Sequence, residues 1–205
     1  RLWPLIFPVL QKDLLVKSII PEGVKIIQMS PPRTGSTLLL NIVHGLYAPD
    51  NPVIYWHKWS DTPPKGEAGI IKTHDCSYKA WAENFPDHKL YFVCSERREI
   101  KALIPLENNI CIDNEFVLHN NVVVFRYDEL LYAKSPAIVQ MVERKTVVER
   151  IANRLKSIIP LPQDLSSAID RTMKMDALCD ELKNEPFSYW DKHYGIHGSH
   201  RGGKR

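Results

Sequence analysis

The chain has 205 residues, of which 44% are hydrophobic, and a formal net charge of +3. This length is enough for one domain with a substantial core, so we expect a single domain over residues 1–205. The small net charge implies neither a polybasic tail nor a strongly positive field over the molecule, so no nucleic-acid partner is expected. Every apolar run is shorter than the ~20 residues that cross a bilayer, so no membrane span is expected in the given chain.

The four cysteines lie far apart in the sequence, without a CxxC pair or a zinc-type spacing. We expect buried free thiols in a reducing compartment, and therefore a cytoplasmic protein, with one or two disulfides as the alternative. The given chain shows no signal peptide, but it begins with Arg1 rather than Met, so an upstream anchor or signal that was trimmed stays open. The cysteines are Cys76, Cys94, Cys111 and Cys179.

Proline and apolar runs organise the first part of the chain. Residues 1–22 contain Pro4, Pro8 and Pro21 and are predicted to form an irregular arm. Short apolar runs follow, each continuous rather than alternating, which is typical of strands covered on both faces. These runs are residues 24–29, 69–73, 90–94 and 122–125.

Stretches with helical periodicity separate or follow these runs. After the first run, apolar residues recur at the spacing of one helix face and predict a helix. Residues 135–159 open with a Ser-Pro start signal and predict a second helix. A further helix is predicted over residues 165–183. This alternation predicts an α/β three-layer sandwich with a central, mainly parallel sheet, in which ligands bind at the carboxyl ends of the strands. The predicted apolar stripes are Leu38, Leu39, Ile42, Val43 and Leu46 in the first helix, and Ile138, Val139, Val142, Val148, Ile151, Leu155 and Ile158 in the second.

Two segments are predicted to be irregular. Residues 51–67 are rich in Pro, Trp and Lys and indicate a long loop that is suited to cover a substrate. Trp56 and His57 in this loop are candidate substrate contacts, although the same side chains are equally suited to pack the loop onto the body. The Gly-rich residues 197–205 indicate a flexible tail, with an expression remnant as the alternative for the last residues.

The turn after the first predicted strand carries the chemistry of an anion site. A strand–loop–helix turn directs successive amides and the positive end of a helix at one point. Gly35 allows a close approach of the backbone, and Arg33 adds a planar cation that suits phosphate or sulfate. The spacing does not fit GxxxxGK(S/T), so this is not a Walker A loop. The alternative is a helix cap with an exposed arginine. The hydroxyl donors of the turn are Thr34, Ser36 and Thr37.

The stretch PRTGSTLL resembles the 5′-phosphosulfate-binding loop, P-K/R-S/T-G-S/T-S/T, of sulfotransferases that use 3′-phosphoadenosine 5′-phosphosulfate (PAPS). Arginine at position 33 is similar to the membrane-associated and bacterial branches, since the cytosolic branch usually has lysine. The stretch GIIKTHD, at the end of the second predicted strand, resembles the K-T-H motif of the cytosolic branch. This resemblance implies that His74 is the catalytic base and that the family fold holds PAPS, with 3′-phosphoadenosine 5′-phosphate (PAP) as the product.

The residues themselves suit this chemistry. Sulfuryl transfer to a hydroxyl needs a base, donors for the charge that develops on the leaving phosphate, and alignment. The unperturbed pKa of histidine makes His74 a suitable candidate base, and Lys72, two residues earlier, projects to the same face of the strand. Lys72 and Arg33 are therefore expected near the bridging oxygen of the donor, and no metal is required. The alternative is that Lys72 and His74 are merely solvated residues at the end of a strand.

The rest of the resemblance, over about residues 24–200, is weaker. Where the family has an arginine for the 3′-phosphate, this chain has Ser95, with Arg97 and Arg98 just beyond it. Either these residues share the role, or the 3′-phosphate is held elsewhere, and a solvated start of a helix is the plain alternative. The fourth strand resembles the family segment whose tyrosine, here Tyr127, lies near the nucleotide. The tail is only loosely similar to the family's closing segment, and its candidate contacts are Gly198, Ser199 and Arg201.

We therefore expect a PAPS-dependent sulfotransferase that acts on a small-molecule or carbohydrate hydroxyl, with a homodimer left open. One alternative is a P-loop nucleotide kinase, which magnesium dependence would reveal. The other is a catalytically inactive nucleotide-binding module of the same fold, which would bind without turnover.

Overall fold

The computed structural model describes residues 20–32, 34–48, 69–76, 78–97, 120–130, 137–160, 164–182, 190–191 and 193–197. Within these residues, the main sheet has four strands in the order β2-β1-β3-β4, and all neighbouring pairs are parallel. The predicted parallel sheet is therefore confirmed. Within it, β1 lies between β2 and β3, the strands that end at the predicted site residues. The strands are β1 (Val24–Met29), β2 (Ile70–Thr73), β3 (Lys89–Glu96) and β4 (Val122–Arg126).

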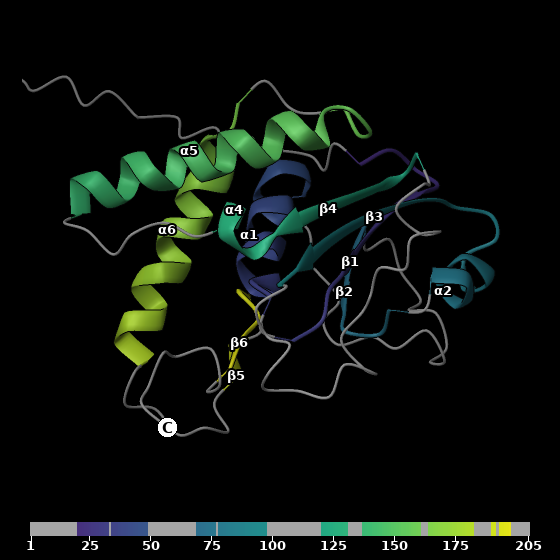
Figure 1. Cartoon of the computed structure of the whole chain (residues 1–205), viewed down its shortest axis with the longest axis horizontal. Helices are drawn as coiled ribbons and strands as arrows, with labels where there is room; N and C mark the ends of the chain where they lie inside the picture. The colour runs from purple at the N-terminus through teal and green to yellow at the C-terminus, as the bar shows by residue number, and fades with distance from the viewer. Residues whose placement is uncertain are drawn as a thin grey trace, which may run out of the picture.

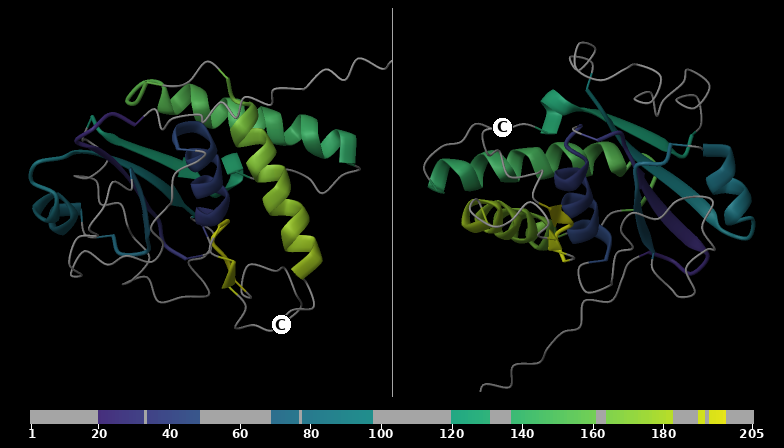
Figure 2. Two further views of the ribbon diagram at one scale, coloured as in Figure 1. Left: turned by 180° about the vertical axis from the view of Figure 1, so that it is seen from behind. Right: turned by 90° about the horizontal axis from the view of Figure 1, so that it is seen from below.

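Both faces of this sheet are buried, which explains the continuous apolar runs. Successive side chains alternate between the faces, so Ile26 of β1 joins one hydrophobic cluster and Ile27 joins the other. The first cluster is covered by α1 (Ser36–Tyr47), α5 (Ala137–Leu155) and α6 (Ser166–Glu181), and the second by α2 (Tyr78–Asn84) (Figures 1 and 2). Helices on both faces of a parallel sheet confirm the predicted three-layer α/β sandwich.

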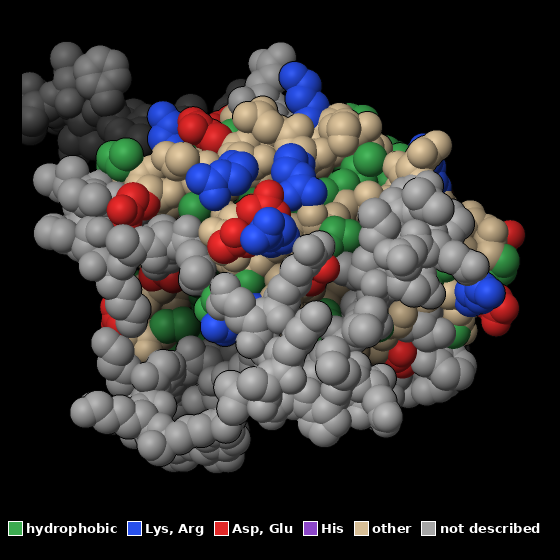
Figure 3. All heavy atoms as spheres, in the orientation of Figure 1, with side chains coloured by type: hydrophobic (Ala, Val, Ile, Leu, Met, Phe, Trp, Pro, Cys, Tyr) green, Lys and Arg blue, Asp and Glu red, His purple; other side chains and the backbone are tan. Residues whose placement is uncertain are grey.

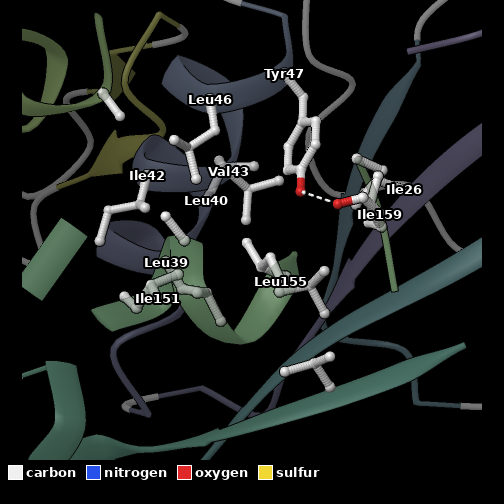
Figure 4. Close-up of a cluster of buried hydrophobic side chains, with 14 of the residues drawn as sticks. Ile26, Leu39, Leu40, Ile42, Val43, Leu46, Tyr47, Ile151, Leu155 and Ile159 are labelled. Carbon is white, nitrogen blue, oxygen red and sulfur yellow. Dashed lines mark hydrogen bonds between the residues drawn. The ribbon is translucent and has the colours of Figure 1, made fainter. Parts of the chain in front are cut away.

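The helix α1 lies at the centre of the larger layer. Its predicted apolar residues are packed into the first cluster, together with Tyr47, whose hydroxyl lies 3.4 Å from the carbonyl oxygen of Ile159 (Figure 4). The helix α1 also contacts α6 closely at Gly45, where an added Cβ would lie only 2.4 Å from Cα of Ala168. Glycine therefore sets the approach of α1 and α6.

The apolar stripe predicted for α5 is partly wrong. Val142 is 56% exposed, whereas Val147, outside the predicted stripe, is buried in the core. In the N-terminal half of α5, the buried face instead carries Arg144, which donates to Asp176 of α6 at 2.6 Å. An ion pair between two helices replaces the apolar contact that the periodicity indicated.

Further short elements were not predicted. The helix α2 covers the second face, and α4 (Tyr127–Leu130) follows β4 directly. A small antiparallel hairpin pairs β5 (Trp190–Asp191) with β6 (Ile196–His197). The backbone of its turn is held by Asn41 of α1, which donates to the carbonyl oxygen of Tyr194 at 2.8 Å. This contact places the hairpin beside α1 (Figure 2).

The prediction of free thiols throughout is wrong at one position. Cys94 and Cys179 are free, but Cys76 is disulfide-bonded. The alternative of a disulfide therefore applies, and the thiol argument for a reducing compartment loses its support. Cys111 lies outside the described residues.

The surface over β4, α4 and α5 carries paired charges. Arg126 pairs with Asp128 at 3.1 Å, and Arg154 pairs with Glu129 at 2.6 Å. Figure 3 shows basic and acidic side chains interleaved over this region. Among the helices of the described ranges, none combines the length and the apolar character that crossing a membrane requires.

Candidate functional site

The carboxyl ends of β1, β2 and β3 meet at one edge of the sheet, where the β1–α1 loop (described residues 30–32, 34 and 35) leads into α1. Gly35 is the N-cap of α1 and has a φ of 82°, in the left-handed region that favours glycine. The helix begins as the Leu39 amide donates to the Gly35 carbonyl oxygen at 3.0 Å. Because a glycine caps the helix, no cap side chain competes for the first amides, which give this end a partial positive charge.

Gly35 also lies against α4. A Cβ at this position would lie 2.8 Å from Cδ1 of Leu130 and 3.2 Å from Cδ2 of Tyr127. The loop is therefore pressed against the end of β4, and only glycine satisfies both the backbone angle and the contact. Tyr127, predicted to lie near the nucleotide, is thereby placed next to the loop.

Lys72 extends from β2 beneath the first turn of α1. It is fully buried, and its Nζ donates to Oγ1 of Thr37 at 3.1 Å. Burial lowers the pKa of Lys72 to about 7. An anion at the start of α1 would favour the charged form, so this lysine is suited to respond to a phosphate or sulfate group.

His74 follows β2 directly and is half-buried. Its Nδ1 lies 2.5 Å from the carbonyl oxygen of Ser30 in the β1–α1 loop. A carbonyl oxygen only accepts, so Nδ1 carries the hydrogen, and the lone pair of the neutral ring is on Nε2. The contact with the loop thereby fixes the orientation of the imidazole and leaves Nε2 as the nitrogen with the chemical capacity to accept a proton.

The hydroxyl groups of Ser30, Thr34 and Ser95 hold the β1–α1 loop in place through hydrogen bonds. Ser30 Oγ accepts from Nε2 of Gln28 at 2.7 Å and from the Ser95 amide at 2.8 Å. Thr34 Oγ1 donates to the carbonyl oxygen of Pro31 at 2.7 Å and lies 2.8 Å from Ser95 Oγ. Sequence reasoning missed Ser30 and Gln28, although a buried glutamine inside the apolar run VKIIQM was a signal for a polar network.

Arg97 lies just beyond β3 and stacks on α4. Its guanidinium carbon is 4.2 Å from the ring centroid of Tyr127, within the range of a cation–π contact. The same tyrosine contacts Gly35, so Arg97, Tyr127 and the loop form one continuous group. A basic side chain therefore lies close to the loop on the β3 side, as Lys72 does on the β2 side.

The structure brings together most of the predicted residues that it describes. Thr34, Gly35, Ser36 and Thr37 occupy the loop and the first turn of α1, with Ser36 buried and Thr37 bound to Lys72. Ser95 is also present but is fully buried. The remaining predicted contacts lie outside the described residues: Arg33, Trp56, His57, Arg98, Gly198, Ser199 and Arg201.

No protein-family model, curated protein or solved structure matched this chain. Fold and geometry define the class of protein as an α/β sandwich with amides, hydroxyls and basic groups at the carboxyl edge of a parallel sheet. Within the described ranges, no group of three or more His, Cys, Asp or Glu side chains is arranged to hold a metal ion.

Proposed function

We propose that the protein is a sulfotransferase that moves a sulfuryl group from PAPS to a hydroxyl acceptor. The observation that carries the proposal is the pair of contacts from the end of β2 to the β1–α1 turn. His74 contacts the loop at the Ser30 carbonyl oxygen (2.5 Å), and Lys72 contacts the first turn of α1 at Thr37 Oγ1 (3.1 Å). A base at one end of an amide-rich turn and a cation at its other end are the parts that in-line group transfer requires.

The donor set is compatible with PAPS. The amides at the start of α1, Thr37 Oγ1 and Lys72 suit the 5′ end. Arg97 over Tyr127 offers a cation and an aromatic face for the 3′-phosphate side. Bound PAPS would supply the activated sulfuryl group, with PAP as the leaving product. Arg33 is expected to add its charge at the same turn.

Each residue has a defined task in this proposal. His74 Nε2 takes the proton of the acceptor hydroxyl, and the Ser30 carbonyl stabilises the resulting imidazolium through the Nδ1 hydrogen. With the anionic donor bound, Lys72 is held in its charged form beneath the turn and stabilises the negative charge that develops on the leaving phosphate. The loop amides fix the direction of attack.

The test is the variant His74→Ala. Transfer of labelled sulfate from PAPS to a mixture of sugar, phenol, lipid and peptide acceptors should be lost, and the affinity for PAP, measured by calorimetry, should change little. His88→Ala is the matched control, because His88 precedes β3 at the opposite end of the sheet and should leave transfer intact. Turnover retained by His74→Ala would place the base elsewhere.

An inactive nucleotide-binding module is the second candidate. It is favoured by Ser95, which occupies the position of an expected arginine and is fully buried against Thr34. Tight binding of PAP by the wild-type protein without transfer to any acceptor would support this candidate. Magnesium-dependent phosphoryl transfer from ATP would instead support the kinase.

A further inference from the structure

Ser95 lies at the carboxyl end of β3, where the strand reaches the β1–α1 loop. Its side chain is 0% exposed. Its amide donates to Ser30 Oγ at 2.8 Å, and its own Oγ lies 2.8 Å from Oγ1 of Thr34. Ser95 therefore contacts two separate positions of the loop, one through the backbone and one through the side chain.

The direction of the side-chain bond follows from the hydrogens available. Thr34 has a single hydroxyl hydrogen, and it is donated to the carbonyl oxygen of Pro31, which only accepts. In the contact between the two hydroxyl groups, Ser95 must therefore be the donor and Thr34 the acceptor. The result is a chain of hydrogen bonds from Ser95 through Thr34 to Pro31.

A second set of bonds fixes the other end of the loop. Ser30 Oγ accepts from both Gln28 and Ser95, and the Ser30 carbonyl oxygen accepts from His74. Movement of the Ser30 backbone would therefore also move the imidazole. Ser95 is the residue that joins this set of bonds to the Thr34 chain.

We infer that Ser95 is a positioning residue that clamps the β1–α1 loop to the end of β3 and does not itself contact the nucleotide. The inference rests on the proposed function for its ligand, but the clamp is a property of the protein alone. Because the Thr34 hydrogen is directed at Pro31, the clamp also assigns Thr34 to support of the loop, and the amides at the start of α1 face the ligand.

The first experiment measures the affinities of PAP and AMP for wild type and for Ser95→Ala. Loss of the clamp should weaken both ligands by the same factor, about tenfold, since the hydrogen bond acts on the loop that holds their common 5′-phosphate. Weakening of PAP alone would mean that Ser95 contacts the 3′-phosphate and would overturn the inference. Thr172→Val, which deletes a buried hydroxyl bonded only within α6, is the control and should leave both affinities unchanged.

A double-mutant cycle separates clamping from a general structural effect. Thr34→Val removes the bond to Ser95 and also the bond to Pro31, so it should weaken PAP at least as much as Ser95→Ala does. The double variant should be no weaker than Thr34→Val alone, because the bond between the two side chains is already lost. Thr34→Ser keeps the hydroxyl and should restore the wild-type affinity. Fully additive losses in the double variant would contradict the clamp. If Ser95→Ala does not fold, Ser95→Cys can replace it, because the thiol has nearly the same shape as the hydroxyl but is a weaker hydrogen-bond donor.

Hydrogen–deuterium exchange without ligand keeps the two proposals distinguishable. Ser95→Ala should accelerate exchange at the amides of residues 34–37 and not in β1, whereas Thr172→Val should not affect the loop. If wild type does not bind PAP, the proposed function fails, but the clamp is still judged by this measurement. Unchanged exchange at residues 34–37 would refute the clamp.

Discussion

Lys72 is the titratable side chain on which the site depends most for its charge. It is fully buried, and desolvation lowers its pKa to about 7 from the ordinary 10.5. Between these pH values, the folded protein holds a neutral lysine, whereas the unfolded chain holds a charged one. Unfolding in this window takes up a proton, so the free energy of unfolding rises with pH from about 7 to 10.5.

Lys72→Met should therefore be more stable than wild type at pH 7, by an amount on the order of a few kcal/mol, because it removes the cost of burying the ammonium group. The advantage should shrink as the pH rises towards 10.5 and disappear above it, where the wild-type lysine is neutral in both states. Urea unfolding of both proteins at neutral and alkaline pH measures the difference.

The matched control is Lys79→Met, which replaces an exposed lysine of α2. Because its side chain is exposed in the folded protein, this variant removes no cost of burial and should not gain stability at neutral pH. An advantage for Lys72→Met that stays equal at both pH values would show that the lysine is not desolvated as described.

At the scale of elements, the start of α1 depends on the backbone of Gly35. The φ of 82° strains any residue with a Cβ, and such an atom would also meet Leu130 Cδ1 at 2.8 Å. Gly35→Ala should therefore destabilise the protein by about 2–4 kcal/mol, the sum of a backbone and a steric cost. It should also weaken PAP, because the first turn of α1 must shift. Thermal unfolding and calorimetry measure the two effects.

Gly23→Ala isolates the backbone cost. Gly23 has a similar φ of 75°, but an added Cβ there meets nothing within 4 Å. The excess loss of Gly35→Ala over Gly23→Ala should be reduced when Leu130 is also replaced by alanine. Equal losses for the two glycine variants would mean that the contact with α4 contributes nothing.

The elements themselves were largely predictable from the sequence. The strands β1, β2 and β3 are buried on both faces, so their apolar runs are continuous, and β1 was predicted with the observed bounds. The missed helix α2 has only 7 residues, too few for a clear periodicity. The stripe of α5 was wrong at Val142 because the partner of that half is Asp176 on another helix, which pairs with Arg144. Local periodicity contains no information about that partner.

The site, too, was only partly predictable from the sequence. Lys72 and His74 could be found because residues at the carboxyl ends of neighbouring parallel strands must meet. The bond between Thr34 and Ser95 joins residues 61 positions apart, and resemblance had suggested a ligand contact for Ser95 instead. Which hydroxyl donates to which is decided by tertiary geometry alone, so no motif indicates it.

At the scale of the whole molecule, the sheet order determines how the proposed ligand is held. Lys72 from β2 and Arg97 beyond β3 lie on the two sides of β1, with the loop between them. PAP should therefore raise the thermal unfolding temperature in the presence of EDTA. At ligand concentrations of about 100 times the dissociation constant, the stabilisation should be about 2.7 kcal/mol.

AMP is the matched comparison ligand, because it lacks only the 3′-phosphate. At the same concentration it should stabilise the protein much less, since the cation on the β3 side has no phosphate to bind. An equal response to AMP would remove the argument for recognition of the 3′-phosphate, and a requirement for magnesium would favour the kinase.

The central position of β1 also affects how the chain folds while it is being synthesised. The chain leaves the ribosome from its N-terminus, so the loop after β1 emerges well before its supports. His74, which contacts the loop at Ser30, lies 44 residues after Ser30 in the sequence. Ser95, which contacts the loop at Thr34, lies 61 residues after Thr34. A nascent chain that ends before β3 therefore contains every loop residue but lacks the contacts from Ser95, so the proposed nucleotide ligand should not assist the earliest stages of folding.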